Sequence, residues 1–311
     1  MITSMIFIIG AAHVDLSIHI GGPISMGRTN PASQQTAAGG VAANIARYLA
    51  SDKRSAPSVI FGAARGQFSM RVQFLGVSNL DQFDSLARHL YGFGIKSQFV
   101  TIAGQSPSYT AILDNAGELV IGAACMDLYD AITPDDVIPY LPQTGSVVMD
   151  ANFPEKVLRA VAETIPLTMS LFAAGTSIEK VERLLPIMGR LDGLVLNRAE
   201  AAMLVAKGST AQMAQQLAAL MRSRGFVLVS DGADVAALAQ DGVIVEAAPK
   251  PLETSRTIRS VNGAGDAMAA RLFGLYLQGA SRIRPTSDIL NELLQDALAA
   301  GAAFAAGESN V

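Results

Sequence analysis

The 311-residue sequence contains a single cysteine, Cys125, and no tryptophan. One cysteine excludes an intrachain disulfide framework and a multi-cysteine metal site, and it suits a reducing compartment, so we expect a cytoplasmic protein. Charged residues make up only 16% of the chain, and 23 Lys and Arg stand against 27 Asp and Glu without a basic block. The electrostatic signature of a nucleic-acid-binding protein is therefore missing.

Long hydrophobic runs are also missing. No stretch offers the roughly 18 continuous apolar residues that a membrane-spanning helix requires, so we expect no membrane partner. The apolar start, Met1 to Ala12, precedes the first basic residue, Arg28, so it lacks the positive region of a signal peptide and is expected to be a buried strand. A hydrophobic content of 50% excludes a disordered chain.

Short apolar runs and helical patterns alternate along most of the chain. Each run has the form of a parallel strand that is covered on both faces, and the alternation is typical of βαβ units. We therefore predict an α/β fold with a mostly parallel central sheet. The runs are 5–9, 71–75, 146–149, 167–172, 194–196 and 226–230; the helical patterns are 82–91, 155–165, 178–185, 211–224 and 264–278; a β-pair follows at 235–240 and 243–247.

Two stretches, 14–36 and 98–124, contain β-like runs without helices between them. They predict a small antiparallel sheet that projects from the main domain as a lid over the substrate. The expected organisation is an α/β domain of residues 1–14, 37–97 and 125–311 and a β-lid of residues 15–36 and 98–124. The exposed edges of such a lid invite pairing with a second copy of the chain. Residues 51–70 indicate a surface excursion without recognisable chemistry.

The segment from Asn262 to Ala270 carries the strongest local signal. Gly263, Ala264 and Gly265 open a helix of small residues, and Asp266 lies in its first turn. Unpaired N–H groups at a helix N-terminus bind anions, so a phosphate fits there, and we expect these donors to keep Asp266 ionised as a proton acceptor. A glycine-rich turn with an aspartate that merely complements the helix dipole fits the spacing equally well.

A second glycine pair enters a helix near the start of the chain. Gly39 and Gly40 allow a ligand to approach the backbone, and the Asn44 amide can donate to and accept from a sugar hydroxyl. Asp15 follows the first strand at the sheet edge where open α/β sheets bind ligands. The alternatives are an ordinary helix entry for the glycines and a turn or capping role for Asp15.

Asn197 and Glu200 follow the run 194–196 and open another helix. The spacing matches a capping box, in which Asn197 is the cap and Glu200 its partner. The functional alternative is that they order water molecules around a magnesium ion, which keeps several of its waters in protein sites.

Together these motifs resemble the PfkB family of carbohydrate and nucleoside kinases, over nearly the whole chain and in the family's order. The resemblance implies a ribokinase-like three-layer α/β/α fold with a small β-sheet lid. Gly39, Gly40 and Asn44 are similar to the family's first signature, Asn197 to Glu200 to its N-x-x-E element, Gly263 to Asp266 to its second signature, and Ser230 to Gly232 to its nucleotide loop.

Within the family the chain is most similar to the pseudouridine kinase branch. The element Thr29-Asn30-Pro31 is typical of that branch, as are the stretches 125–130 and 149–152. Asn30 offers the donors and acceptors that a uracil edge requires, although it could instead cap a lid turn.

Three positions depart from the pattern. Ala43 stands where a basic residue is common, Ser260-Val261 replaces the residues usual before the second signature, and Arg271 stands where glycine is usual. Because of Ser260-Val261, a monovalent-cation site is less expected.

The resemblance implies an ATP- and Mg²⁺-dependent phosphotransferase that acts on the primary hydroxyl of a sugar or nucleoside. Asp266 would be the base, assisted by the amides of Gly263, Ala264 and Gly265. The other implied roles are sugar binding by Asp15, Asn30, Gly39, Gly40 and Asn44; nucleotide binding by Asn197, Ser230, Gly232 and Gly265, with adenine between 230–232 and the 298–305 helix; and water-mediated magnesium binding by Glu200.

The best specific substrate is pseudouridine, with ribokinase-like, fructokinase-like and purine nucleoside kinases as alternatives. Outside this class, the alternatives are a sugar-binding protein without activity and a Rossmann oxidoreductase. The intact Asp266 argues against the first, and Gly10-Ala11-Ala12-His13 lacks the dinucleotide fingerprint. A Walker-type phosphate loop is absent from the sequence, and His13, His19 and His89 are too scattered for a metal cluster.

Overall fold

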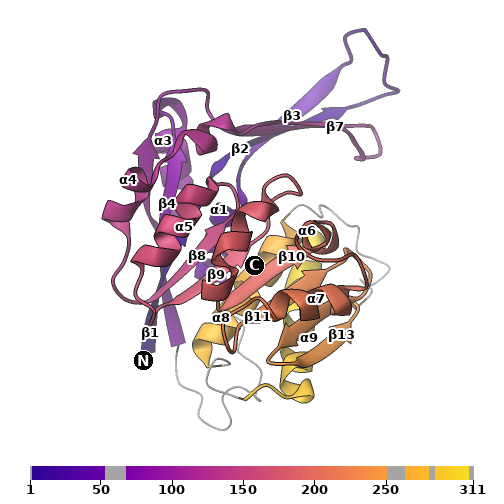
Figure 1. Ribbon diagram of the computed structural model, residues 1–311. Coiled ribbons are helices and arrows are strands. Elements are labelled where there is room, and N and C mark those ends of the chain that lie inside the picture. Colours follow the sequence, from indigo (N-terminus) through magenta and orange to yellow (C-terminus); the bar gives the residue numbers. More distant parts are fainter. Residues whose placement is uncertain (1, 53–67, 251–262, 280–283, 308–311) are drawn as a thin grey trace.

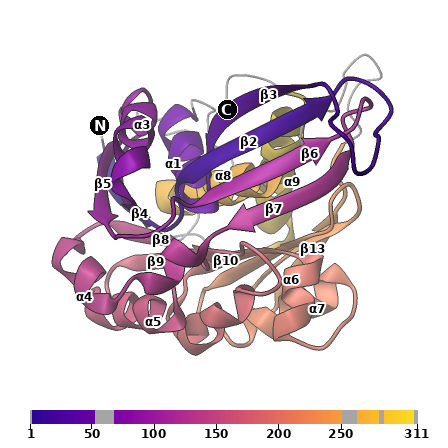
Figure 2. The same ribbon diagram turned by 90° about the horizontal axis from the view of Figure 1, so that it is seen from above.

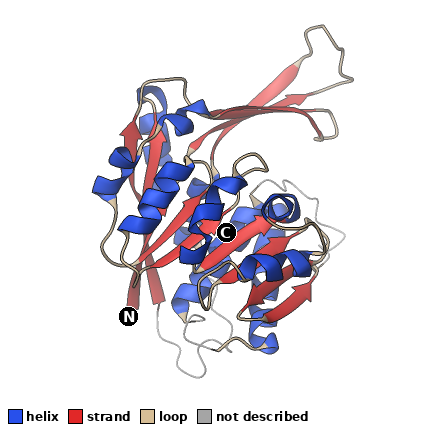
Figure 3. Cartoon of the chain, in the orientation of Figure 1, coloured by secondary structure: helices blue, strands red, loops and turns tan. Residues whose placement is uncertain are grey.

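The computed structural model describes residues 2–52, 68–250, 263–279 and 284–307, which fold around two β-sheets (Figures 1 and 3). The larger sheet has nine strands in the order β13-β12-β11-β10-β9-β8-β1-β4-β5, and the smaller has four in the order β3-β2-β6-β7. The predicted α/β class with a small separate sheet is confirmed.

The nine-stranded sheet is parallel except at one edge, where β12 and β13 are antiparallel to their neighbours. Its central strands are short and almost entirely buried, as the continuous apolar runs indicate. The strands are β1 (Ile2–Ile9), β4 (Phe68–Ser78), β5 (Lys96–Thr101), β8 (Ser146–Asp150), β9 (Ser170–Ala174), β10 (Gly193–Asn197), β11 (Phe226–Ser230), β12 (Ala236–Gln240) and β13 (Val243–Ala247).

Helices cover both faces of this sheet and enclose two hydrophobic cores. Successive residues of β1 alternate between them: Ile6 and Ile8 face one core, and Phe7 and Ile9 face the other. The first core lies under α1 (Val41–Ser51), α3 (Leu80–Tyr91), α8 (Ala264–Gln278) and α9 (Ser287–Ala305); the second lies under η1 (Asp127–Ala131), α4 (Pro134–Val137), η2 (Ile138–Tyr140), α5 (Glu155–Thr164), η3 (Val181–Arg190), α6 (Arg198–Leu204) and α7 (Thr210–Ala218).

The four-stranded sheet projects beyond the carboxyl end of β1 (Figures 1 and 2). Its strands are β2 (His13–Ile20), β3 (Ala32–Gly39), β6 (Ser108–Leu113) and β7 (Leu119–Cys125). The prediction of a purely antiparallel sheet was wrong, because β2 and β6, which are distant in sequence, pair in parallel.

The boundary predicted for the lid also needs correction. Residues 98–101 belong to β5, which pairs in parallel with β4 in the large sheet rather than with the small one. Phe99 of β5 is buried in the first core, so this strand is held by the helical layer. At the other predicted excursion, 51–70, residues 53–67 lie outside the described residues, and Phe68 already begins β4.

A proline and a buried arginine account for other departures from expectation. The helical pattern 178–185 forms the 3₁₀ helix η3 instead, which contains Pro186; proline cannot donate an α-helical hydrogen bond. Arg271, where a glycine was expected, is 2% exposed and links α8 to the carboxylates of Asp52 and Asp296, at 3.0 and 2.6 Å. It therefore ties α8 to the end of α1 and to α9.

Candidate active site

Polar residues and a glycine gather at the carboxyl edge of the large sheet, and Asn197 and Ser230 among them were predicted for the site. Gly10, Asp150, Asn197 and Ser230 lie at the ends of β1, β8, β10 and β11, and these strands are parallel. This edge is where open α/β sheets bind ligands. The N-termini of α1 and α8 carry two further predicted side chains, Asn44 and Asp266.

Asp150 is a buried carboxylate that holds the edge together. It is 0% exposed and accepts hydrogen bonds from the backbone N–H groups of Ala11 and Ala42, each at 3.0 Å. The Asn152 backbone and side chain donate to it at 2.9 and 3.1 Å. These bonds join the ends of β1 and β8 to the start of α1. The site list drawn from sequence omits Asp150, although its place after a buried strand was a usable signal.

Glycines are required at the start of α1 because other atoms of the protein approach the backbone closely there. Gly40 has φ of 103°, and a side chain there would overlap the backbone carbonyl of Ala11. A side chain at Gly39 would overlap the carboxylate of Asp15. The two glycines therefore let α1 pack against the end of β1 and leave room for Asp15.

Asp15 lies in β2 beside a chain of hydrogen bonds. The Tyr129 hydroxyl donates to the Ala12 carbonyl at 2.9 Å, so it accepts from Nδ1 of His13 at 3.1 Å. Nε2 of the same His13 ring lies 3.2 Å from Oδ1 of Asp15.

Oδ1 of Asp15 is buried but makes no well-formed hydrogen bond within the described part of the chain. A buried carboxylate oxygen without a well-aligned donor is costly, and a hydroxyl of a bound ligand would satisfy it. This observation fits the sugar-binding role predicted for Asp15.

Asn44 and Asp266 meet across the site. Nδ2 of Asn44 donates to Oδ2 of Asp266 at 2.8 Å, although 222 positions separate the two residues. Oδ1 of Asn44 accepts from Arg47 Nη2, also at 2.8 Å. The Asn44 amide is therefore fixed with its oxygen turned toward Arg47, and what it offers a ligand is its second N–H rather than the donor and acceptor pair expected from sequence.

The Asp266 pKa is raised from 3.8 to about 7. Burial contributes most, and the negative charges of Asp150 and Glu200 raise it further, while the Asn44 hydrogen bond and the Arg47 charge lower it. The expectation that the helix terminus keeps Asp266 fully ionised is thus not met at neutral pH, because burial outweighs the N-terminal donors. A carboxyl group with a pKa near the working pH is well suited to accept a proton.

The N-terminus of α8 is open to a ligand. Gly263 adopts a left-handed conformation with φ of 99°, and among the described residues no side chain caps the helix. At Gly265 a side chain would meet nothing within 4 Å. Free N–H groups beside open space form an anion site on a helix of 15 residues.

Asn197 and Glu200 form the capping box that the spacing allowed. Asn197 Oδ1 accepts from the Glu200 N–H at 2.9 Å, and Glu200 Oε2 accepts from the Asn197 N–H at 3.0 Å. Glu200 is 5% exposed, and burial raises its pKa. Gly175 gives it room, since a side chain there would overlap the carboxylate. Nearby in sequence, Thr176 has a buried hydroxyl that lacks a partner in the described structure. Its position after β9 at the same edge adds a polar group that the sequence did not suggest.

The nucleotide loop predicted at 230–232 is the turn between β11 and β12. Ser230 is buried, and its hydroxyl donates to the Leu196 carbonyl at 3.4 Å. Gly232 has φ of 60° and open space around it. Beside it, Asp231 pairs with Arg198 at 2.8 Å.

Asn30 is occupied by its own loop. Its Oδ1 accepts from the Ser25 N–H at 2.8 Å, and its Nδ2 donates to the carbonyls of Ser25 and Arg28 at 3.1 and 3.0 Å. Both amide hydrogens are used, and the loop lies at the tip of the small sheet in Figure 1. The structure therefore favours the loop-capping alternative over direct recognition of a base.

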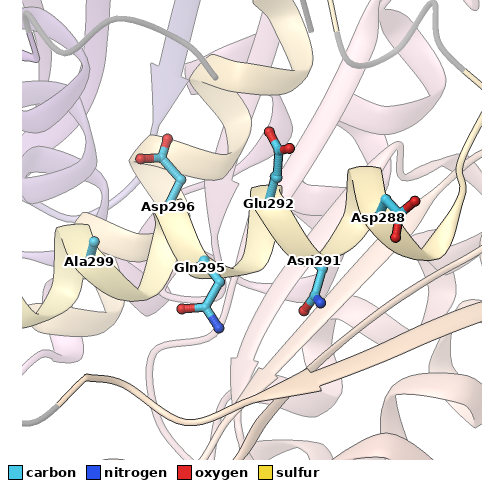
Figure 4. Close-up of a pocket in the computed structure, with 6 residues that line it drawn as sticks. All are labelled: Asp288, Asn291, Glu292, Gln295, Asp296 and Ala299. Carbon is cyan, nitrogen blue, oxygen red and sulfur yellow. The ribbon is translucent and has the colours of Figure 1, made fainter. Parts of the chain in front are cut away.

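The hollow of about 610 Å³ along α9 is separate from these residues (Figure 4). Three carboxylates line it, and they would repel the phosphates of a nucleotide. Its lining residues are Asp288, Asn291, Glu292, Gln295, Asp296 and Ala299. Within the described ranges, no three His, Cys, Asp or Glu side chains converge to hold a metal ion. In the same ranges, no helix is both long and apolar enough to cross a membrane.

A comparison with known protein families gives a match over nearly the whole chain. Residues 4–307 match the model of the pfkB family carbohydrate kinases. The chain belongs to this family. Proteins of the pfkB family are phosphotransferases that act on a hydroxyl group, and the ribokinase-like fold expected from the signatures is confirmed.

Three individual relatives are informative. The chain is 26% identical over 289 residues to the pseudouridine kinase of Escherichia coli, covering 88% of this chain and 84% of that protein. A carbohydrate kinase structure from Agrobacterium tumefaciens is 27% identical with a TM-score of 0.75, covering 96% and 90% of the two chains. Thermotoga maritima ribokinase, at 15% identity, shares the fold with a TM-score of 0.72 over 99% of this chain and 96% of its own.

Proposed function

We propose that the protein transfers the γ-phosphoryl group of ATP to the primary 5′ hydroxyl of a nucleoside, with pseudouridine as its substrate. The observation that carries the proposal is the placement of Asp266 in the first turn of α8, bonded to Asn44 and with a pKa of about 7. A base beside an open anion site is the arrangement that phosphoryl transfer to an alcohol requires.

In the proposed reaction, Asp266 takes the proton of the 5′ hydroxyl as its oxygen attacks the γ-phosphorus. The bond between this phosphorus and the β–γ bridging oxygen breaks, and ADP leaves. The N–H groups of Gly263, Ala264 and Gly265 stabilise negative charge on the transferred group. Asp15, Gly39, Gly40 and the free N–H of Asn44 hold the ribose.

The residues present fit a magnesium–nucleotide complex. Glu200 and Asn197 would face the phosphates through water, and the unpartnered Thr176 hydroxyl supplies a further polar group at this edge. Bound magnesium supplies charge neutralisation on the phosphates. Gly232 leaves open space beside the turn that would approach the nucleotide. The residues Ser260-Val261, which bear on a monovalent cation, lie outside the described residues.

Pseudouridine is supported by the similarity to the E. coli pseudouridine kinase and by the Thr29-Asn30-Pro31 element. Because Asn30 is held by its own loop, other residues must contact the base. The strand register places Ser17 opposite Gln35, on the same face of the small sheet as Asp15. Residues 15 and 17 are successive on that face, so a base attached to a ribose at Asp15 would meet Ser17 and Gln35.

Gln35 is exposed and can both donate to and accept from a uracil edge. We expect Gln35→Ala to lower kcat/KM for pseudouridine while changing kcat/KM for ribose little. Gln34→Ala, whose side chain projects from the opposite face, is the matched control. Equal losses for nucleoside and free sugar would show that Gln35 does not read the base.

The substrate itself is tested by competition. Pseudouridine, uridine, adenosine, ribose and fructose are offered together with ATP and magnesium, and the phosphorylated products are separated. The proposal requires pseudouridine 5′-phosphate to dominate. Preferred phosphorylation of ribose or fructose would overturn the nucleoside assignment and leave a sugar kinase of the same family.

The other face of the small sheet carries several apolar side chains that the described chain leaves at least partly exposed. Leu16, Ile18, Ile112 and Ile121 share this face by register, and Ile121 is 56% exposed. We propose that a second copy of the chain covers it, because the sheet can pair with its own apolar counterpart. Sedimentation of the wild type as a dimer and of Ile121→Lys as a monomer would support this; a wild-type monomer would refute it.

A further inference from the structure

Arg47 lies one turn beyond Asn44 on α1 and reaches back to it. Its Nη2 donates to Asn44 Oδ1 at 2.8 Å, and Asn44 Nδ2 donates in turn to Asp266 Oδ2 at 2.8 Å. The three side chains form an unbroken chain of donors and acceptors that ends on the proposed base. Neither the family signatures nor the sequence-predicted site includes Arg47.

Packing fixes the Arg47 guanidinium. Its central carbon lies 5.8 Å from the centre of the Tyr48 ring and 5.7 Å from that of the Phe93 ring. Nη1 lies 3.4 Å from Nε2 of His89. Since arginine has no acceptor, Nε2 of His89 must be the unprotonated nitrogen of that contact. Burial and the Arg47 charge lower the His89 pKa, which favours this neutral form.

The orientation of Asn44 depends on this contact. An amide can rotate so that its oxygen and nitrogen exchange places, and in the rotated form the oxygen of Asn44 would face the carboxylate of Asp266. The fixed donor Arg47 selects the orientation in which the nitrogen faces Asp266.

We propose that Arg47 is a positioning residue, which holds the Asn44 amide so that it donates to Asp266 and thereby keeps the base ionised and correctly directed during phosphoryl transfer. This inference rests on the proposed function. Arg47 acts through Asn44 and does not itself contact the reacting atoms.

The charged groups around Asp266 agree with this role. Asp150 at the end of β8 and Glu200 on α6 both oppose ionisation of Asp266, whereas Arg47 favours it. Tyr48 on α1 is buried with a raised pKa, so it remains neutral. Among the described groups that act on Asp266, Arg47 therefore supplies a positive charge that offsets two carboxylates.

The test compares Arg47→Met, which keeps the aliphatic stem, with Arg47→Lys, which keeps the charge. Two readouts are used: the pH profile of kcat, and the titration of the Asp266 carboxyl carbon by NMR in protein labelled at aspartate. The Asp266 signal is identified by its absence in Asp266→Asn. The NMR titration needs no substrate, so it is independent of the proposed reaction.

For Arg47→Met we expect the Asp266 titration to move upward by about one unit, because a nearby charge and an oriented donor are both lost. At a wild-type pKa of about 7, that shift lowers kcat roughly fivefold at pH 7 and leaves it nearly unchanged at pH 9. Arg47→Lys should recover part of the shift. Arg88→Met, an exposed arginine on α3, is the control and should change neither readout.

The outcomes separate the two proposals. An unchanged Asp266 titration in folded Arg47→Met, or a kcat that falls equally at every pH, would refute the positioning role. A shifted titration in a protein that phosphorylates no sugar or nucleoside would uphold the positioning of Asp266 and refute the kinase function. If Arg47→Met does not fold, Arg47→Lys decides: its Asp266 titration must lie less than about half a unit above that of the wild type, and a larger shift would show that the role of the charge is wrong.

Discussion

Asp266→Asn should make the protein more stable as it becomes inactive. In the unfolded chain Asp266 ionises near its ordinary pKa of 3.8, whereas in the folded protein it ionises at about 7. Between these values the folded state holds a proton that the unfolded state has lost, so the free energy of unfolding falls as the pH rises. Above about pH 7 this loss of unfolding free energy is complete and no longer changes with pH. Because asparagine is always neutral, Asp266→Asn does not undergo this loss.

The size of the effect follows from the shift. A move from 3.8 to about 7 corresponds to about 4 kcal/mol at ~1.4 kcal/mol per unit. Asp266 keeps partial contact with solvent, which screens the neighbouring charges, so we expect about 2 kcal/mol at pH 8. Asparagine can still accept the hydrogen bond from Asn44, so that contact is retained.

The assay is urea unfolding followed by far-UV circular dichroism at about pH 5 and about pH 8, with turnover measured on the same samples. The stability gain of Asp266→Asn should be larger at pH 8 than at pH 5. Glu155→Gln, a change to a half-exposed carboxylate on α5, is the control and should shift stability by less than about 1 kcal/mol at either pH. An Asp266→Asn protein that is less stable than wild type at pH 8 would refute the reasoning.

Three further outcomes follow from the site and the core. The wild-type kcat should rise roughly tenfold between pH 6 and pH 8 and then level off, because the ionised fraction of Asp266 follows a pKa of about 7; a flat profile would exclude Asp266 as the titrating base. Gly39→Ala should raise KM for the sugar at least about tenfold, because the new side chain displaces Asp15. Gly22→Ala, whose new side chain meets nothing within 4 Å, should leave KM unchanged. Equal KM values for the two variants would contradict the role of Asp15. Arg271→Met should lower the free energy of unfolding in urea by about 3 kcal/mol, because it removes the guanidinium from between two carboxylates. Arg159→Met, at a half-exposed arginine, should lower it by under about 1 kcal/mol. A loss below about 1 kcal/mol for Arg271→Met would show that Arg271 does not support the packing of α8.

The sequence predicted the central strands well because burial on both faces leaves a continuous apolar run. It could not assign 96–101 to a sheet, since this strand, KSQFVT, mixes polar and apolar residues just as the strands of the small sheet do. Which sheet a strand joins depends on its partners, and here Phe99 packs under α3 beside Phe83, at 5.8 Å between ring centres.

Site residues that belong to short sequence motifs, such as Gly39, Asn197 and Asp266, could be predicted from the sequence. Contacts between distant segments were not accessible: nothing near Asp150 in the sequence indicates that the N–H groups of Ala11 and Ala42 converge on it. Asn30 illustrates the opposite error, because its bonds span only two to five residues, and such short-range capping is what asparagine does in most turns.

The central claim is that this chain phosphorylates a primary hydroxyl with Asp266 as the base. The most direct measurement incubates the wild type and Asp266→Asn with ATP, magnesium and pseudouridine, then quantifies ADP and identifies the phosphorylated carbon by NMR. We expect one ADP for each pseudouridine 5′-phosphate with the wild type, and a turnover about 10²- to 10⁴-fold lower with Asp266→Asn although both substrates still bind. Comparable turnover of the two proteins, or a phosphate on a secondary hydroxyl, would contradict this claim.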